Sequence, residues 1–166
     1  SWINFLYTNQ FGGILADDMG LGKTVQTIAF SSQVPDKGPI LVIGPTNVIY
    51  NWKKEIDKFT TKQKVEVYSG PNRHNLLDKI VFNNFIITSF GVLKNDIELL
   101  SVIPFKAVFV DEAQNIKNPN TKVSKAIKQL NTRFRLAMTG TPIENHLQDL
   151  WNIFDFVMPN YLGSYK

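Results

Sequence analysis

Six short apolar runs rich in β-branched residues alternate along the chain with stretches of helical length. The runs, bounded by turn residues, are GGILAD, PILVIGP, VEVYSG, FIITSFG, AVFVDEA and RFRLAMTG. Strands that alternate with helices form a parallel sheet, because each crossover returns the chain to the same edge. Strands that are apolar almost throughout are typical of a sheet covered on both faces. The pattern therefore predicts an α/β fold with a mainly parallel central sheet between two helical layers.

Composition limits the class of protein and of site. The 166 residues, 43% of them hydrophobic, are enough for one compact domain with its own core. The 18 Lys and Arg residues against 14 Asp and Glu residues give a net charge of +4, which permits an acidic partner such as nucleic acid. The absence of cysteine excludes disulfides, thiolate metal sites and cysteine nucleophiles. Since no apolar run has the length of a membrane span, we expect a soluble intracellular protein without a membrane partner.

The first run leads into DDMGLGKT, which fits a phosphate-binding loop between a strand and a helix. Gly20 and Gly22 would let backbone amides approach phosphate oxygens at a helix N-terminus. Lys23 would add a positive charge near the β- and γ-phosphates, and Thr24 would offer its hydroxyl to Mg²⁺. Asp17 stands where the usual pattern has its first glycine, a change that turn geometry tolerates. Alone, this segment leaves open a glycine-rich turn that binds nothing.

A carboxylate pair, Asp111 and Glu112, follows the apolar run AVFV. Because the carboxyl ends of parallel strands meet at one edge of a sheet, we expect this pair beside the phosphate loop. Asp111 would hold Mg²⁺ through a water, and Glu112 would polarise the water that attacks the γ-phosphate. The sequence Asp-Glu after a strand is by itself a common start of a helix. Together with the phosphate loop it predicts a site that hydrolyses ATP with Mg²⁺.

The order of these motifs resembles that of the Swi/Snf-type ATPases of helicase superfamily two. The matching segments cover nearly the whole chain: ILADDMGLGKT (motif I), LVIGPTNVIYNWKKEIDKF (motif Ia), FIITSFGVL (motif Ib), VFVDEAQNIKNPNTK (motif II) and LAMTGTPIENHLQDLWNIFDFVMPNYLGS (motif III and its following helices). Motif I of this family commonly carries an acidic residue at the position of Asp17. The resemblance implies a P-loop NTPase fold, a RecA-like three-layer α/β/α sandwich over residues 1–166. It also implies the N-terminal ATP-binding lobe of a DNA-dependent ATPase that moves along double-stranded DNA.

The resemblance further implies roles for individual residues. Lys23 and Glu112 are expected to be catalytic, and Thr24 and Asp111 to bind the metal. The expected nucleotide-binding residues are Asp18, Met19, Gly20, Leu21, Gly22, Lys23, Thr24 and Gln114. The residues expected to contact DNA, or to couple DNA to the nucleotide, are Pro45, Thr46, Asn51, Trp52, Thr88, Ser89, Phe90, Thr139, Gly140 and Thr141. Such DNA contacts are expected to be phosphate contacts, which do not read sequence.

Two parts of the family's machinery are expected outside this chain. The glutamine motif that recognises adenine would precede Trp2, and a second RecA-like lobe would supply an arginine finger. The arginines of this chain, Arg73, Arg133 and Arg135, all precede motif III. Because an arginine finger raises the rate about 10³- to 10⁵-fold, we expect slow hydrolysis by this lobe alone. We expect Arg133 and Arg135 to pair with acidic neighbours instead.

Several interpretations stay open at the level of sequence. Trp52 fits either core packing or a position near DNA, and the aromatic series Trp151, Phe154, Phe156 and Tyr161 fits either core packing or a contact with the second lobe. His74 and His146 show no spacing typical of metal ligands and are expected to have surface or packing roles. Pro119 is expected to open a helix with Asn118 as its N-cap.

Two other functions also fit the motifs. One is a strand-separating helicase of the DEAD or DEAH kind, and the other is a nucleotide-switched DNA-binding scaffold in which hydrolysis is incidental. The motor's own substrate, a protein or nucleoprotein, would be selected by segments outside this chain. The DEAQNIKN form and the lack of cysteine favour a bacterial or archaeal cytoplasm, with the nucleus as the location in a eukaryote.

Overall fold

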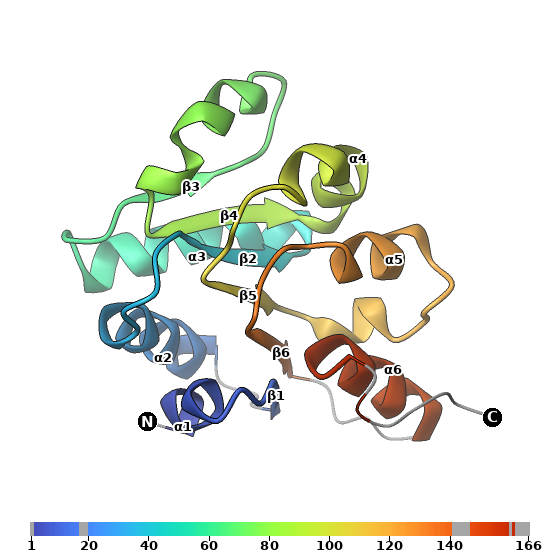
Figure 1. Ribbon diagram of the computed structural model, residues 1–166. Helices are drawn as coiled ribbons and strands as arrows, with labels where there is room; N and C mark the ends of the chain where they lie inside the picture. Colours follow the sequence, from blue (N-terminus) through green and yellow to red (C-terminus); the bar gives the residue numbers. More distant parts are fainter. Residues whose placement is uncertain (1, 17–19, 141–146, 160, 162–166) are drawn as a thin grey trace.

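In the computed structural model, residues 2–16, 20–140, 147–159 and 161 are described. Within them the six expected strands form one sheet in which every pairing is parallel, in the order β1-β6-β5-β2-β4-β3 (Figure 1). The strands are β1 (Gly13–Ala16), β2 (Ile40–Gly44), β3 (Val65–Val67), β4 (Phe85–Ser89), β5 (Ala107–Val110) and β6 (Arg135–Thr139). The predicted parallel sheet is therefore confirmed.

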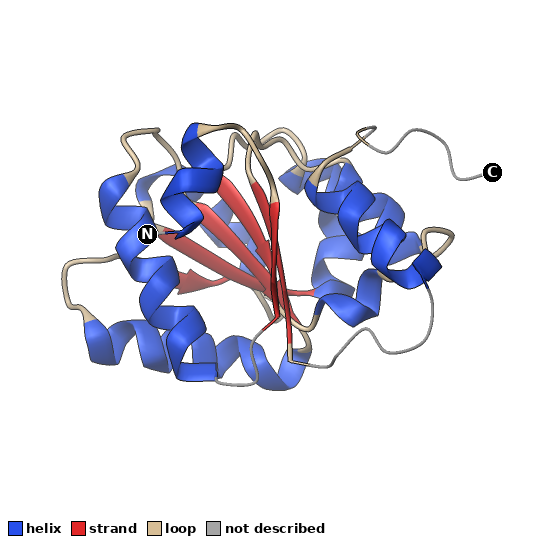
Figure 2. Ribbon diagram, turned by 90° about the horizontal axis from the view of Figure 1, so that it is seen from below, coloured by secondary structure: helices blue, strands red, loops and turns tan. Residues whose placement is uncertain are grey.

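Helices cover both faces of this sheet (Figure 2). The α-helices are α1 (Trp2–Thr8), α2 (Gly20–Gln33), α3 (Thr46–Phe59), α4 (Phe90–Leu100), α5 (Lys122–Lys128) and α6 (Leu147–Val157), and two 3₁₀ segments are η1 (Arg73–Phe82) and η2 (Ala113–Ile116). Apolar residues of α1, α2 and α3 pack in one core cluster, and those of η1, η2, α4, α5 and α6 pack in another. Across the described ranges, no helix combines the length and apolar character needed to cross a membrane.

The alternation of side chains along each strand explains why the strands are apolar throughout. In β2, Leu41 and Ile43 join the cluster with α4 and α6, whereas Ile40 and Val42 join the cluster with α2 and α3. All four side chains are fully buried. Successive side chains of a strand point to opposite faces, so a sheet covered on both sides needs an apolar residue at every position.

The expected start of α5 was wrong by a few residues. The helix begins at Lys122, and the N-cap is Thr121, whose side-chain oxygen accepts a hydrogen bond from Ser124 N at 3.1 Å. Asn118 Oδ1 instead accepts from Asn120 N at 3.0 Å, which closes a turn two residues long. Asparagine forms such turns readily, and here the turn competes with helix capping.

Candidate functional site

The predicted catalytic residues of motif I, at the start of α2, and of motif II, after β5, lie together at the carboxyl edge of the sheet. Ala16 at the end of β1 pairs with Thr139 of β6, and Val110 at the end of β5 pairs with Ala137 of the same strand. The strand of motif III therefore lies between those of motifs I and II. A cavity of about 240 Å³ opens at this edge, lined by Lys23, Thr24, Val48, Asn51, Trp52, Glu55, Asp111, Glu112 and Gly140.

Lys23 and Asp111 form a buried ion pair across this cavity. Lys23 lies in the first turn of α2 and is 6% exposed, and Asp111 follows β5 and is 8% exposed. Lys23 Nζ lies 3.6 Å from Asp111 Oδ1, which also accepts a hydrogen bond from the Glu112 backbone amide at 2.9 Å. The structure thus brings together the expected phosphate-binding cation and the expected metal-binding carboxylate. In the sequence, Lys23 and Asp111 are 88 positions apart.

Helix α3 supplies the opposite wall of the cavity. Trp52 is only 5% exposed, and its indole Nε1 donates a hydrogen bond to Asp111 Oδ2 at 2.9 Å. One turn later, the half-buried Glu55 accepts a hydrogen bond from the hydroxyl of Thr24. Trp52 is therefore part of the core cluster on the side of α2 and α3, as one of its two interpretations expected, and it also lines the cavity. Sequence reasoning missed Glu55, although its spacing of three residues from Trp52 puts both on one helix face.

A chain of side chains joins motif II to motif III. Glu112 has the left-handed backbone conformation, with φ 52° and ψ 51°. Gln114 donates a hydrogen bond to the Glu112 carboxylate, and its Oε1 accepts from Thr139 Oγ1 at 3.1 Å. Left-handed backbone costs a residue other than glycine about 1–3 kcal/mol and is concentrated at functional sites. Gln114, expected to bind nucleotide, is not among the residues that line the cavity and instead connects Glu112 to β6.

The adjacent N-termini of α3 and α4 carry five of the residues expected to lie along DNA, namely Pro45, Thr46, Thr88, Ser89 and Phe90. Gly44 and Ser89, the last residues of β2 and β4, are direct partners in the sheet. The Thr88 hydroxyl is buried and donates to the Tyr68 carbonyl at 2.8 Å, while Ser89 Oγ caps α4 by accepting from Val92 N at 3.3 Å. Helix α3 follows Pro45, whose side chain offers no hydrogen-bond acceptor. Backbone amides of two neighbouring helix N-termini therefore share this part of the edge.

The remaining predicted residues are placed as follows. Gly20, Leu21 and Gly22 form the start of α2, Thr46 and Asn51 are exposed on α3, and Phe90 is the first residue of α4. Gly140 lines the cavity directly after β6. Asp17, Asp18, Met19, Thr141 and His146 lie outside the described residues.

A buried carboxylate, Asp96, anchors η1 to α4. Arg73 binds it with two hydrogen bonds, from Nε to Oδ2 at 2.6 Å and from Nη2 to Oδ1 at 3.0 Å. The buried Tyr68 hydroxyl donates to Oδ2 at 2.8 Å, and His74 Nε2 lies 3.1 Å from the same oxygen. The Arg73 hydrogen bonds, aided by Tyr68 and His74, lower the pKa of Asp96 from 3.8 to about 2. Burial, together with the hydrogen bond to Asp96, raises the pKa of Tyr68, which stays neutral.

We predict that Asp96→Asn lowers the free energy of unfolding by about 2–3 kcal/mol at pH 7, because Arg73 loses its charged partner. The pKa of Asp96 is lower in the folded state, so its stabilisation is complete above pH 4 and is lost as the pH falls through about 2. The difference between wild type and variant should therefore shrink below pH 4. Urea unfolding followed by circular dichroism at pH 7, 4 and 3 measures it.

Asp57→Asn is the matched control for this measurement. Asp57 pairs with Lys53 at 3.0 Å on the exposed side of α3, one helical turn apart. Exposed pairs of this kind contribute less than about 0.5 kcal/mol. An effect of Asp96→Asn as small as that of Asp57→Asn would contradict a stabilising role for the buried cluster.

The structure corrects the expectation for Arg135 and locates two residues of the aromatic series. Arg135 does not pair with an acidic neighbour among the described residues; its guanidinium donates to the Leu130 carbonyl at 3.1 Å, and burial lowers its pKa. Arg135 is the first residue of β6, and its guanidinium reaches back to Leu130 in the segment that precedes the strand. Of the aromatic series, Phe156 is in the core and Tyr161 is exposed.

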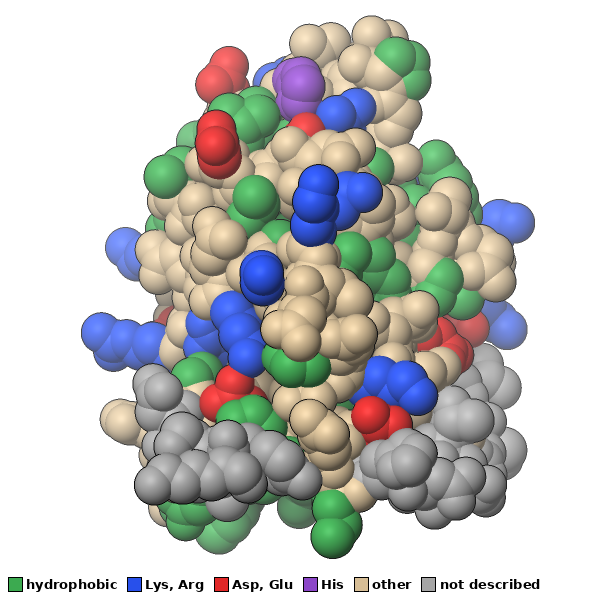
Figure 3. All heavy atoms as spheres, turned by 90° about the vertical axis from the view of Figure 1, so that its right-hand side faces the viewer, with side chains coloured by type: hydrophobic (Ala, Val, Ile, Leu, Met, Phe, Trp, Pro, Cys, Tyr) green, Lys and Arg blue, Asp and Glu red, His purple; other side chains and the backbone are tan. Residues whose placement is uncertain are grey.

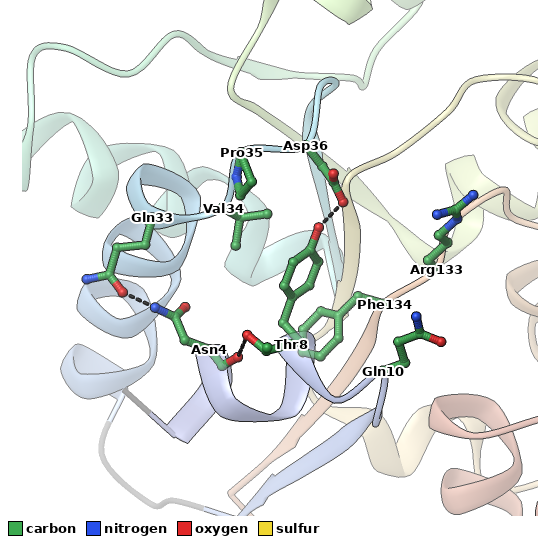
Figure 4. Close-up of a pocket in the computed structure, with 10 residues that line it drawn as sticks. Asn4, Thr8, Gln10, Gln33, Val34, Pro35, Asp36, Arg133 and Phe134 are labelled. Carbon is green, nitrogen blue, oxygen red and sulfur yellow. Dashed lines mark hydrogen bonds between the residues drawn. The ribbon is translucent and has the colours of Figure 1, made fainter.

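A second cavity, of about 360 Å³, lies at the amino edge of the sheet, away from these motifs (Figure 4). It is bounded by α1, the end of α2 and the segment before β6. Hydrogen bonds from Asn4 to Gln33 and from Tyr7 to Asp36 hold α1 against the end of α2 and the segment that follows it. None of the residues predicted to bind nucleotide, metal or DNA lines it.

Comparisons with known proteins agree with this geometry. Residues 1–166 match the family model described as SNF2-related domain. A protein of Mycoplasma pneumoniae named as an ATP-dependent helicase is 47% identical over 99% of this chain and 16% of its own length. Switch 2 of Arabidopsis thaliana is 39% identical over 96% of this chain and 20% of its own length. The chain therefore spans only a small part of the curated relatives that it matches.

One solved structure extends the comparison to the fold. The Sulfolobus solfataricus SWI2/SNF2 ATPase core in complex with dsDNA is 44% identical and superposes with a TM-score of 0.89, over 99% of this chain and 35% of that one. At this identity and similarity the match confirms the predicted RecA-like α/β/α sandwich.

Proposed function

The chain belongs to the SNF2-related domain family, and from that premise we propose that it is the first lobe of a motor that couples ATP hydrolysis to movement along double-stranded DNA. The observation that carries the proposal is the convergence of Lys23, Thr24, Asp111 and Glu112 in one cavity at the carboxyl edge of the sheet. This is where open α/β sheets bind their ligands. A second RecA-like lobe would be supplied from outside these 166 residues.

In this proposal Lys23 and the amides at the start of α2 bind the phosphates of ATP. The residues present fit a magnesium ion, because Thr24 and Asp111 both line this cavity and offer hard oxygen ligands. The metal would neutralise charge that develops on the phosphates during transfer. Glu112 orients the attacking water and accepts its proton, and the hydrogen bond from Gln114 holds that carboxylate in place.

Double-stranded DNA would run across the N-termini of α3 and α4. Their first-turn amides and the exposed Thr46 side chain suit phosphate groups, which are attracted to helix N-termini whatever the base sequence. Figure 3 views the molecule from the side of the carboxyl edge of the sheet. It shows Lys and Arg side chains across the middle of the face, with acidic side chains above and below. Such a surface binds the backbone of any sequence, as a translocating motor requires.

The partner lobe is needed for fast hydrolysis. Arg73 is held by Asp96 and Arg135 by the Leu130 carbonyl, so neither is directed at the cavity. An arginine from the second lobe would supply the missing positive charge. We propose that the motor acts in the compartment that holds its DNA, which is the cytoplasm of a bacterium or archaeon or the nucleus of a eukaryote. The substrate that it moves or remodels would be a protein or nucleoprotein.

The test is ATP turnover by the full-length protein with and without linear duplex DNA. We expect duplex to stimulate turnover at least tenfold, and the stimulation to fall steeply as salt rises from 50 to 200 mM, because phosphate contacts release counterions. Turnover that ignores DNA would contradict the proposal. The name of the Mycoplasma relative favours strand separation as the alternative; release of a labelled strand from a forked duplex would support it. If Glu112→Gln loses turnover but keeps the DNA affinity and remodelling activity of the wild type, the result would support a nucleotide-switched scaffold.

A further inference from the structure

Two side chains of α3 contact the two groups that are proposed to hold magnesium. Trp52 Nε1 donates to Asp111 Oδ2 at 2.9 Å, and Glu55 accepts from the Thr24 hydroxyl. Trp52 and Glu55 are three residues apart, so they project from the same face of the helix. Helix α3 therefore contacts both of the proposed metal ligands.

The contact from Trp52 fixes how the Asp111 carboxylate is turned. Its Oδ2 accepts from the indole, while its Oδ1 accepts from the Glu112 amide and faces Lys23 Nζ. Rotation about the carboxylate would break contacts on both oxygens at once. The indole is an uncharged donor, so it orients Asp111 without removing the negative charge that a cation needs.

The contact from Glu55 fixes the direction of the Thr24 hydroxyl. A hydroxyl has one hydrogen and two lone pairs. When its hydrogen points to Glu55, its lone pairs face away from that carboxylate and are free to bind a cation. Glu55 also lines the cavity itself.

We propose that Trp52 and Glu55 are positioning residues that set the affinity of the site for the divalent cation by orienting Asp111 and Thr24. This inference rests on the proposed function. Partners that orient metal ligands in this way typically change metal affinity by about 10- to 100-fold when they are replaced. The role concerns the metal step, so nucleotide binding without a metal is independent of both residues.

The test uses Mn²⁺ as a paramagnetic substitute for Mg²⁺, with the full-length protein and a non-hydrolysable ATP analogue. Free Mn²⁺ is measured by electron paramagnetic resonance in a titration. We expect Trp52→Phe, which keeps an aromatic ring but removes the N–H donor, and Glu55→Ala to weaken Mn²⁺ binding about 10- to 100-fold. Glu55→Gln keeps a hydrogen-bond acceptor and should restore affinity to within about threefold of wild type.

Turnover gives a second readout. In both weakened variants the Mg²⁺ concentration for half-maximal turnover should rise by the same factor, while kcat at saturating Mg²⁺ returns to nearly the wild-type value. Asp57→Asn on the exposed side of α3 is the matched control for Glu55, and Trp2→Phe on the exposed side of α1 is the control for Trp52. Both controls should leave the affinity for Mn²⁺ unchanged.

The outcomes separate this inference from the proposed function. Wild-type affinity for Mn²⁺ in Glu55→Ala, in a protein that binds the analogue normally, overturns the inference and leaves the function intact. Loss of kcat that saturating Mg²⁺ does not recover also overturns it, because it indicates a structural role. A wild-type protein that does not bind the analogue at all contradicts the function itself. Glu55 is only half-buried, so Glu55→Ala decides the question even when Trp52→Phe does not fold.

Discussion

Replacing Lys23 by alanine is expected to weaken ATP binding by about 10²- to 10³-fold and to abolish turnover at cellular ATP concentrations. The side chain is 6% exposed, and its ammonium group lies 3.6 Å from Asp111 Oδ1. Losing a desolvated contact between this cation and the phosphates would cost about 2–5 kcal/mol of binding free energy, and each 1.4 kcal/mol is a factor of ten in affinity. The variant loses the cation that would meet the phosphates and leaves Asp111 without its partner.

Titration with a fluorescent ATP analogue measures this effect, at a temperature well below the melting transition of both proteins. Lys53→Ala is the matched control, because Lys53 also pairs with a carboxylate, Asp57, but lies on the exposed side of α3. The control should change affinity by less than about twofold, since exposed pairs contribute little. An affinity of Lys23→Ala within about threefold of wild type would remove Lys23 from the proposed phosphate site.

Replacing Glu112 by glutamine is expected to lower turnover by about 10²- to 10⁴-fold while ATP affinity changes by less than about threefold. The change removes a base but keeps the shape of the side chain, and general base catalysis is worth about that factor. Two features hold Glu112 at the cavity: its left-handed backbone conformation and the hydrogen bond that its carboxylate accepts from Gln114. A glutamine at this position still offers a side-chain oxygen to Gln114, so the nucleotide should still bind.

Phosphate release in a single turnover, with the full-length protein and duplex DNA, measures the chemical step directly. Glu98→Gln, on the exposed face of α4, is the matched control and should behave as wild type. Undiminished phosphate release by Glu112→Gln would show that another group activates the water. Binding lost together with turnover would instead indicate that Glu112 holds the nucleotide.

The sequence predicted the strands well because each is a short apolar run between turn residues. The run PILVIGP became β2 and FIITSFG became β4, with both faces of each strand buried. The start of α5 was predicted less well, because Asn118 and Thr121 are both good capping residues and only the surrounding backbone decides between them. The site residues stay predictions until the variants above are measured.

The sequence by itself determined the class of fold, the order of the motifs and the kinds of side chain at the candidate site, because periodicity, turn chemistry and motif spacing are local properties. Only the tertiary structure decided that Trp52 contacts Asp111, that Glu55 contacts Thr24, and that Gln114 contacts Thr139. These contacts connect separate strand and helix units, so no local pattern encodes them. They depend on which helix covers which strands, and that arrangement is fixed by the packing of the two apolar faces of the sheet.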